Sequence, residues 1–587
     1  MLWFFKTWVS LLSSDLLLDK VKVMCKYRSA RCIADAAHAH DSNASRQAWH
    51  SWLHEGPANG LGRQHFMSRV ATGWIPAKQC SVRDVIDCQN GGDEDDTILD
   101  DVNDISDHDI DGSLRSEWVP LNAQQAVNQE AEAWANVWQQ GVQGNMPRWP
   151  MQLGDRLPDL AVDTFREACY TFSNGVGLGW DKLHPRAIAR CSDVVINALL
   201  QLFALAEASG KWQETIGIIL VVLIPKSDGG RRPIGLFPTL IRVWMRARLP
   251  VARLWMLQND RSFFYAGPCK GADVAAWKQN LLGEAAHFME LPYVSSLLDL
   301  VKAFDSVPFD CLVECATRLG YNLYLLRLSI ASYLLARVLN VEGCCSVEVF
   351  ATRGLAAGSV LATIELRILL LEAGDRMVSI ALYSRLTLYV DDGTFETVCT
   401  EKSVVKQHAM AVNSFIKDLH SMRMAFSETK NVSCATTDAL ASVANAAIEG
   451  ITIRVAGRVT SLGTGLGAGR RRNMTQAVKR LSSFKQRRHR FKMLKRAGVK
   501  TDRIVRTGGV AYITFGQKSL GVSDSLLLQQ RRSVAAACCA SSGGANLDLS
   551  VALVDGQSRG TADPAFEAHH CNAVEAGMVC CVCGCAH

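Results

Sequence analysis

The 587-residue sequence lacks long apolar runs, and this limits where the chain can act. Beyond the N-terminus, no stretch reaches the roughly 20 uninterrupted apolar residues that a membrane-spanning helix needs. The apolar N-terminus, residues 2–18, is interrupted by Asp15 and has no basic segment before it, so it departs from the pattern of a signal peptide. We therefore expect an intracellular protein with no membrane partner.

Internal repeats are also missing, and so is the dense cysteine pattern of a small disulfide-bonded domain. The 20 cysteines are scattered over a long chain, so we interpret most of them as reduced thiols. The composition, 48% hydrophobic and 20% charged, is typical of a globular protein with enough apolar material for a core. At this length the chain should form several domains rather than one.

Charge of one sign is missing from two segments. Residues 93–111 hold ten acidic residues and no Lys or Arg, which favours a solvated, disordered linker. Residues 470–500 hold 13 Lys and Arg and no acid, which favours a surface for a polyanion. The net charge of +6 conceals this asymmetry. A solvated basic helix and a nuclear localisation signal are other interpretations of the same cations.

Aspartates stand where predicted apolar strands end. Residues 291–300 are typical of a strand and reach Asp299, and residues 386–398 are typical of two strands around a turn at Asp391 and Asp392. A buried carboxylate is costly unless a cation keeps it ionised. Two strands side by side, each ending in Asp, would hold two Mg²⁺ ions about 4 Å apart. Taken alone, the Asp-Asp-Gly sequence is an ordinary hairpin turn.

Further secondary structure is predicted around these strands. The β-branched run at 218–226, a turn at 227–230 and the segment from 231 predict a β-hairpin with cations at its tip. Helices are expected from near residue 124, at 188–208, at 308–320 and at 403–420, and in the basic segment 470–500.

Two of these segments resemble the catalytic motifs of the reverse transcriptases of non-LTR (LINE-type) retrotransposons. They are residues 296–307 (SLLDLVKAFDSV) and 389–392 (YVDD), whose first aspartates are 92 residues apart. Shorter segments that resemble the same family follow its order along the chain, at 179–183, 224–226, 232–234, 353–359, 427–430 and 461–463. The resemblance covers about residues 170–535 and is carried by the whole series rather than by any one piece.

The resemblance implies an α+β protein with the right-hand polymerase fold, made of fingers, a palm with an antiparallel sheet, and a helical thumb. We expect an N-terminal region with its acidic linker at 1–120, an N-terminal extension and fingers at 121–290, the palm at 291–465, the basic thumb at 466–545 and a Cys-rich, unstructured tail at 546–587. In the tail, Cys580, Cys583 and His587 have zinc-like spacing but no well-spaced fourth ligand. Residues 1–170 show no endonuclease pattern, which suggests an element fragment.

The resemblance also implies a catalytic centre. Asp299 and Asp391 would ligate two Mg²⁺ ions, with Mn²⁺ as an alternative, and the backbone carbonyl of Leu300 would complete the coordination. Asp392 would be an additional carboxylate beside them. Lys430 would protonate the departing pyrophosphate.

Nucleotide contacts follow from the same resemblance. Lys226 and Arg232 would neutralise the triphosphate, to which a guanidinium binds bidentately. Phe304 would clash with a ribose 2′-hydroxyl and so select deoxynucleotides, although a core Phe at the start of a helix is an equally good interpretation. Gly358 would let a template or nucleotide approach the backbone closely.

The basic segment follows the palm, where the family's thumb lies against the primer–template duplex. Its cations should contact phosphates in a strongly salt-dependent manner. Those expected to bind nucleic acid are Arg470, Arg471, Arg472, Lys479, Arg480, Arg487 and Arg488.

Together these features predict an RNA-directed DNA polymerase, located in the nucleus, that acts on an RNA template, a DNA primer and deoxynucleoside triphosphates. Two alternatives stay open: a catalytically decayed polymerase fold that binds RNA or DNA, and an RNA-directed RNA polymerase. The intact aspartates favour an active enzyme. Ala357 and Val360, where the family has Gln and Pro, favour decay. The oligomeric state is not determined by these patterns.

Overall fold

A computed structural model describes residues 123–139, 147–225, 230–267, 270–341, 344–468, 472–539, 546–556 and 562–568. These residues form two compact units. The larger unit contains the described residues up to 477 together with 516–521, and the smaller unit, here the helical unit, contains 478–515 and the described residues from 522 onward. The acidic segment 93–111 and the Cys-rich end of the tail lie outside the described residues, so the predictions made for them stay predictions.

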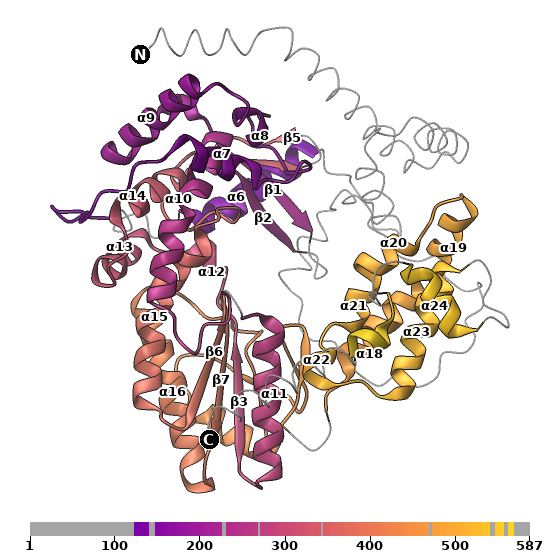
Figure 1. The fold of residues 1–587 in the computed structure, drawn as a ribbon. Coiled ribbons are helices and arrows are strands. Elements are labelled where there is room, and N and C mark those ends of the chain that lie inside the picture. The colour runs from indigo at the N-terminus through magenta and orange to yellow at the C-terminus, as the bar shows by residue number, and fades with distance from the viewer. Residues whose placement is uncertain are drawn as a thin grey trace, which may run out of the picture. The chain divides into compact units, whose positions relative to one another are not determined.

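A five-stranded sheet forms one end of the larger unit. Its strands, in spatial order, are β6 (Ser384–Tyr389), β7 (Asp392–Val398), β3 (Tyr293–Leu298), β8 (Val432–Ala435) and β9 (Arg454–Val455). The central strand β3 runs antiparallel to both β7 and β8. Helix α16 (Glu401–Ser421) packs on one face of this sheet, next to α15 (Ala362–Ile380), and α11 (Ala272–Phe288) covers the other (Figure 1).

A second sheet of four strands lies in the same unit. Its spatial order is β2 (Arg231–Leu236), β1 (Ile219–Pro225), β4 (Arg337–Val341) and β5 (Cys344–Cys345). Strands β1 and β2 form an antiparallel pair, which confirms the predicted β-hairpin, and β1 also pairs in parallel with β4. Helix α6 (Ala123–Trp138), the predicted helix near residue 124, packs against β4 and β5.

Helices surround both sheets, and most of the buried apolar side chains form one large core beside two smaller clusters. The large core centres on α10 (Thr239–Gln258), α14 (Leu323–Tyr333) and α15, each of which buries many of its apolar residues. The other helices of this unit up to residue 446 are α7 (Val162–Tyr170), α8 (Pro185–Ile188), α9 (Asp193–Ser209), η1 (Glu214–Ile216), α12 (Ala303–Ser306), α13 (Phe309–Arg318) and α17 (Asp438–Ala446). A strand pair, β10 (Val459–Ser461) and β11 (Thr464–Leu466), and α22 (Gln517–Leu520) complete the unit.

The helical unit has its own core, in which Phe484, Phe491 and Leu494 pack against Val505 and Val534. Its helices are the main part of α18 (Thr475–Gln486), α19 (Arg488–Arg496), α20 (Asp502–Ile504), the π-helical turn η2 (Val505–Val510), α21 (Ala511–Thr514), α23 (Asp524–Cys538) and α24 (Leu547–Asp555). The helical character predicted for the basic segment is therefore confirmed where the structure describes it. The predicted α+β class is confirmed too, and among the described helices none is long and apolar enough to cross a membrane.

One buried histidine joins α16 to the five-stranded sheet. The ring of His408 is fully buried, and its two nitrogens lie 2.8 Å from Ser296 Oγ on β3 and 2.9 Å from Thr397 Oγ1 on β7. Burial lowers the pKa of His408 from 6.5 to about 3, because the apolar surroundings disfavour the imidazolium. The folded state therefore needs a neutral ring at this position.

We predict that this ring makes stability depend on pH. Because the folded pKa lies below the unfolded value of 6.5, the stabilisation is present above pH 6.5 and is lost as the pH falls toward 3. Below pH 6.5 the loss should approach about 1.4 kcal/mol per pH unit. Urea unfolding of the wild type and of His408→Gln between pH 7.5 and pH 5 measures this: the wild-type midpoint should fall more steeply. Parallel midpoint curves would contradict the prediction.

Candidate active site

The turn between β6 and β7 presents two carboxylates at the end of the five-stranded sheet. Tyr389 pairs with Asp392 across the hairpin, so Val390 and Asp391 are the two turn residues. Val390 has a φ of +62°, in the left-handed region that a β-branched residue rarely adopts. Turns of two residues commonly need such an angle, which Gly or Asn adopts more cheaply than Val. The strain shows that the surrounding sheet holds this turn in one conformation.

Strand register brings Asp299 to the same place. In the antiparallel ladder of β3 and β7, Leu298 pairs with Gly393. The next residues outward on the two strands are Asp299 and Asp392, so these lie opposite each other beyond the last pair. Asp391 precedes Asp392 in the adjoining turn. Residues separated by about ninety positions in the sequence thus share one end of one sheet.

The three carboxylates interact electrostatically. Burial raises the pKa of Asp391, and the negative charge of Asp299 raises it further. Burial also raises the pKa of Asp392 to about 6, and the charges of Asp391 and Asp299 add to this effect. The Asp299 side chain keeps 35% of its surface exposed, so the group is open to a ligand. Like charges gathered in this way disfavour joint ionisation unless a cation compensates them.

Cations from two other segments reach this cluster. Lys430 Nζ lies 3.5 Å from Asp299 Oδ2. Arg232, which is exposed on β2 of the other sheet, lowers the pKa of Asp391 together with Lys430. The structure thus gathers Asp299, Asp391 and Asp392 with two of the cations predicted to serve them.

The backbone of Asp299 is held by a residue that the sequence gave no reason to select. The Asp299 N–H donates to Asn431 Oδ1 at 3.0 Å, and the Ser427 N–H donates to the Asp299 carbonyl at 2.8 Å. Asn431 keeps only 1% of its surface exposed, and its amide also donates to the Thr452 carbonyl at 3.2 Å. Nothing in the sequence distinguishes Asn431 from an ordinary loop asparagine. Only its burial in the structure does so.

Phe304 lies on the short helix α12, just beyond Asp299. Its side chain is half-buried, and its carbonyl accepts the Leu355 N–H at 2.8 Å. The next residue, Asp305, accepts the indole N–H of Trp138 at 2.8 Å in a buried contact with α6. Both hydrogen bonds fix the backbone that carries Phe304. The Leu300 side chain is buried in the core, so only its backbone is available to the carboxylate cluster.

Gly358 needs to be glycine for a reason found within the fold. Its φ is +124°, and a Cβ atom there would lie 2.1 Å from the carbonyl oxygen of Gly235 on β2. The Gly235 N–H donates to the Ala357 carbonyl at 2.5 Å. The close approach seen is therefore that of the β2 backbone. The predicted approach of a template or nucleotide, on the exposed side of Gly358, stays a prediction.

The predicted nucleic-acid cations are placed in different ways. Arg470 and Arg471 lie outside the described residues, as does Lys226, which was predicted to contact the nucleotide. Arg472 belongs to the larger unit, where its Nε lies 2.8 Å from Glu284 Oε1 and its Nη1 donates to the Leu520 carbonyl at 2.8 Å. This residue is thus already engaged within the protein.

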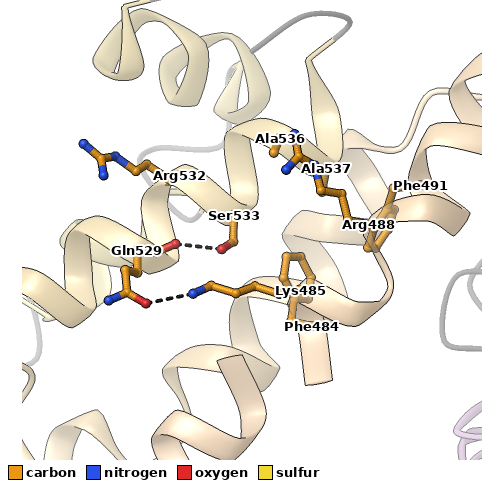
Figure 2. A pocket seen from close by; sticks show the side chains of 9 residues that line it. All are labelled: Phe484, Lys485, Arg488, Phe491, Gln529, Arg532, Ser533, Ala536 and Ala537. Atoms are coloured by element: carbon orange, nitrogen blue, oxygen red, sulfur yellow. Dashed lines mark hydrogen bonds between the residues drawn. The ribbon is translucent and has the colours of Figure 1, made fainter. Parts of the chain in front are cut away.

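The remaining predicted cations lie in the helical unit. Lys479 is exposed. The guanidinium of Arg480 lies over the Phe515 ring, 4.6 Å from its centroid, and that of Arg487 lies 5.2 Å from the centroid of Tyr512. Arg488 lines a pocket (Figure 2). Cations that rest on aromatic rings keep their charge for a polyanion while their stems are held in place.

The donor set fits a metal that binds together with a substrate. In the part of the chain that the structure describes, no three or more His, Cys, Asp or Glu side chains form a group that could hold a metal ion by themselves. Mg²⁺ commonly binds to one or two carboxylates plus substrate phosphates and water rather than to a closed protein cage. Asp299 and Asp391 match that pattern, because they are two carboxylates whose negative charges repel each other.

We predict that Asn431→Ala destabilises the larger unit and disturbs the carboxylate cluster. The substitution leaves the partly buried N–H of Asp299 without its acceptor, which should cost about 1 kcal/mol or more. Chemical unfolding of the variant measures the loss. The matched control is Asn197→Ala, which removes an exposed asparagine of α9. Equal stability of the two variants would show that Asn431 does not hold Asp299.

Comparison with known proteins places this site in a family domain. Residues 224–463 match the family model described as "Reverse transcriptase (RNA-dependent DNA polymerase)". The matched region contains all three aspartates, Lys430 and most of both sheets, and its α+β architecture is that of the right-hand polymerase fold. This part of the chain is therefore similar to the reverse transcriptase family.

The other comparisons give less information about this chain. No curated protein matches the chain. Among solved structures, the chain is similar to apo telomerase from Candida tropicalis truncated from its C-terminal domain, with 13% sequence identity and a TM-score of 0.32. The similarity covers 50% of this chain and 62% of that one, so this chain spans less than two thirds of the telomerase chain's length.

Proposed function

We propose that the chain is an RNA-directed DNA polymerase that adds deoxynucleotides to a primer 3′-hydroxyl on an RNA template. The observation that carries the proposal is the meeting of Asp299 with Asp391 and Asp392 at one sheet end, inside a domain that matches the reverse transcriptase family. The motifs of the sequence further support an origin in a non-LTR element, and the basic segment supports a nuclear location.

The proposed mechanism uses the carboxylates as ligands. Asp299 and Asp391, with the Leu300 carbonyl and the triphosphate, would hold two divalent ions, Mg²⁺ or Mn²⁺, which when bound lower the pKa of the primer hydroxyl and neutralise charge on the phosphates. Asp392, whose pKa is raised to about 6, would stay at the edge of the cluster as a further carboxylate.

The cations would act on the nucleotide. Arg232 is exposed and close enough to influence Asp391, so its guanidinium would bind the triphosphate oxygens beside the aspartates. Lys226, which follows Pro225 in the sequence, would assist it. Lys430, 3.5 Å from Asp299, would give its proton to the pyrophosphate that leaves.

The basic helical unit would hold the RNA template and DNA primer. Its helix α19 has basic residues in its last turn and no acidic residue in its first turn. Contacts of its cations with phosphates would release counterions, so affinity for the duplex should fall steeply as salt rises.

A second candidate function is nucleic-acid binding without catalysis. Ala357 and Val360 flank Gly358 where the resembled family has Gln and Pro, which favours a decayed enzyme. An RNA-directed RNA polymerase is a third candidate, and the half-buried ring of Phe304 argues against it if that ring contacts the sugar.

We predict that Asp391→Asn abolishes primer extension on poly(rA)/oligo(dT) with Mg²⁺. The substitution keeps the side-chain shape and removes the charge, so the rate should fall on the order of 100-fold or more. Chelation of Mg²⁺ should stop the wild type. The matched control, Asp159→Asn, changes an exposed aspartate outside the site and should extend normally.

The outcomes separate the candidates. A wild type that binds the primer–template duplex and does not extend it supports the decayed enzyme. Full activity of Asp391→Asn refutes the assignment of the metal ligand.

We predict that Phe304→Ala weakens the selection of deoxynucleotides. Removal of the ring should relieve the clash with a 2′-hydroxyl and raise ribonucleotide incorporation about tenfold relative to deoxynucleotide incorporation. Single-nucleotide extension with dTTP and with UTP measures the ratio of kcat/KM values. The control Phe350→Ala removes a ring that is 57% exposed. If both nucleotides change equally, the ring is a core residue and not a gate.

A further inference from the structure

The helical unit contains a pocket between its basic helices and α23. The pocket has a volume of about 420 Å³. Its lining residues come from α18 and α19 on one side and from α23 on the other; they are Phe484, Lys485, Arg488, Phe491, Gln529, Arg532, Ser533, Ala536 and Ala537. Figure 2 shows Lys485 reaching across to Gln529. All of these residues belong to one compact unit, so the pocket is a feature of that unit alone.

The charge of the lining is of one sign. Lys485, Arg488 and Arg532 carry three positive charges, and no carboxylate lines the pocket. Lys485 Nζ donates to the neutral Gln529 Oε1 at 2.7 Å, so its charge is not cancelled. Arg488 and Arg532 are exposed, and neither forms an ion pair with any residue in the described ranges. These cations are therefore available to an anion.

A neighbouring arginine shows the contrast. Arg531, adjacent to Arg532 on α23, pairs with Asp563 at 3.0 Å and with Asp548 at 2.6 Å, so it holds α24 and the segment after it against α23. Arg531 thus stabilises the fold, whereas Arg532 lines the pocket, and its guanidinium points away from Lys485 and Arg488 in Figure 2. The pocket cations are thus not needed as ion-pair partners inside the unit.

The floor of the pocket is apolar. Phe484 and Phe491 are nearly buried, with ring centroids 5.5 Å apart, and Ala536 and Ala537 add small side chains opposite them. A volume of about 420 Å³ lies within the range of pockets that hold small organic ligands. An inorganic anion alone would leave this apolar floor unfilled, whereas an anion that carries a planar, partly apolar group would fill it.

We propose that this pocket binds one unpaired nucleotide of a single-stranded nucleic acid. The choice of a nucleic acid over other anions rests on the proposed function. The phosphate lies against the cations at the pocket mouth, and the base enters over the apolar floor, where the guanidinium plane of Arg488 stacks on it. A paired base inside a duplex cannot enter, so the pocket distinguishes single-stranded from double-stranded regions of a template.

The test is a binding measurement with the full chain, without metal or deoxynucleotides. Fluorescence anisotropy compares a labelled single-stranded RNA with a matched RNA–DNA duplex. Ser533→Phe fills the pocket, and Arg488→Gln removes its stacking cation. The matched control is Arg496→Gln, which removes an exposed arginine of α19 outside the pocket. Both pocket variants should weaken single-strand binding about tenfold and duplex binding no more than the control does.

Competition separates the ligand chemistries. Guanosine monophosphate should displace the single strand at a lower concentration than inorganic phosphate or guanosine does. Equal displacement by inorganic phosphate overturns the proposal in favour of a plain anion site. Equal loss of single-strand and duplex binding overturns it in favour of a general basic surface.

Two further readouts keep the outcomes distinct. Circular dichroism shows whether Ser533→Phe folds; if it does not, the exposed Arg488→Gln decides, and binding equal to that of the control overturns the proposal. Primer extension is measured separately. Selective loss of single-strand binding in a chain that does not polymerise supports the pocket and refutes only the proposed catalysis.

Discussion

Antiparallel pairing of β3 with β7 is the constraint on which the site depends. The register that sets Leu298 opposite Gly393 fixes Asp299 opposite Asp392, and the two-residue turn before β7 adds Asp391. A slip of one residue would send each side chain to the other face of the sheet. Buried contacts on both faces oppose such a slip: His408 bonds to Ser296 and Thr397 on one face, and Tyr293 donates to Glu396 at 2.8 Å on the other.

The same pairing creates a repulsion that the rest of the unit has to balance. Burial and the like charges at one sheet end raise the pKa values of Asp391 and Asp392; Lys430 offsets both shifts, and Arg232 offsets that of Asp391. Asn431 fixes the Asp299 backbone without adding charge. Uncharged hydrogen bonds therefore hold the cluster, and the negative charge of its carboxylates is only partly compensated. This is the state expected of a site that binds cations together with substrate phosphates.

Local patterns made the strands and the aspartates predictable. The apolar run before Asp299 and the Asp-Asp-Gly turn carry their signal within a few residues, and α16 was expected at 403–420 and is found at Glu401–Ser421. Contacts between distant segments carried no such signal. Asn431 lies 132 residues from Asp299, and Trp138 lies 167 residues from the Asp305 carboxylate that it contacts. Single polar residues become recognisable only when tertiary pairing shows which of them are buried and bonded.

Backbone contact between Gly235 and Gly358 has a mechanical consequence. A Cβ atom on Gly358 would overlap the Gly235 carbonyl, so the two backbone segments are in direct contact. No side chain lies between them that could change rotamer. The hydrogen bond from the Gly235 N–H to the Ala357 carbonyl is a second contact between these segments. A displacement of the β1–β2 hairpin would therefore carry residues 357–358 with it, so that Arg232 and the glycine segment shift as one rigid body. Neither contact uses the side chain of residue 357 or 360. Substitutions at these two positions therefore leave the connection between the hairpin and residues 357–358 in place.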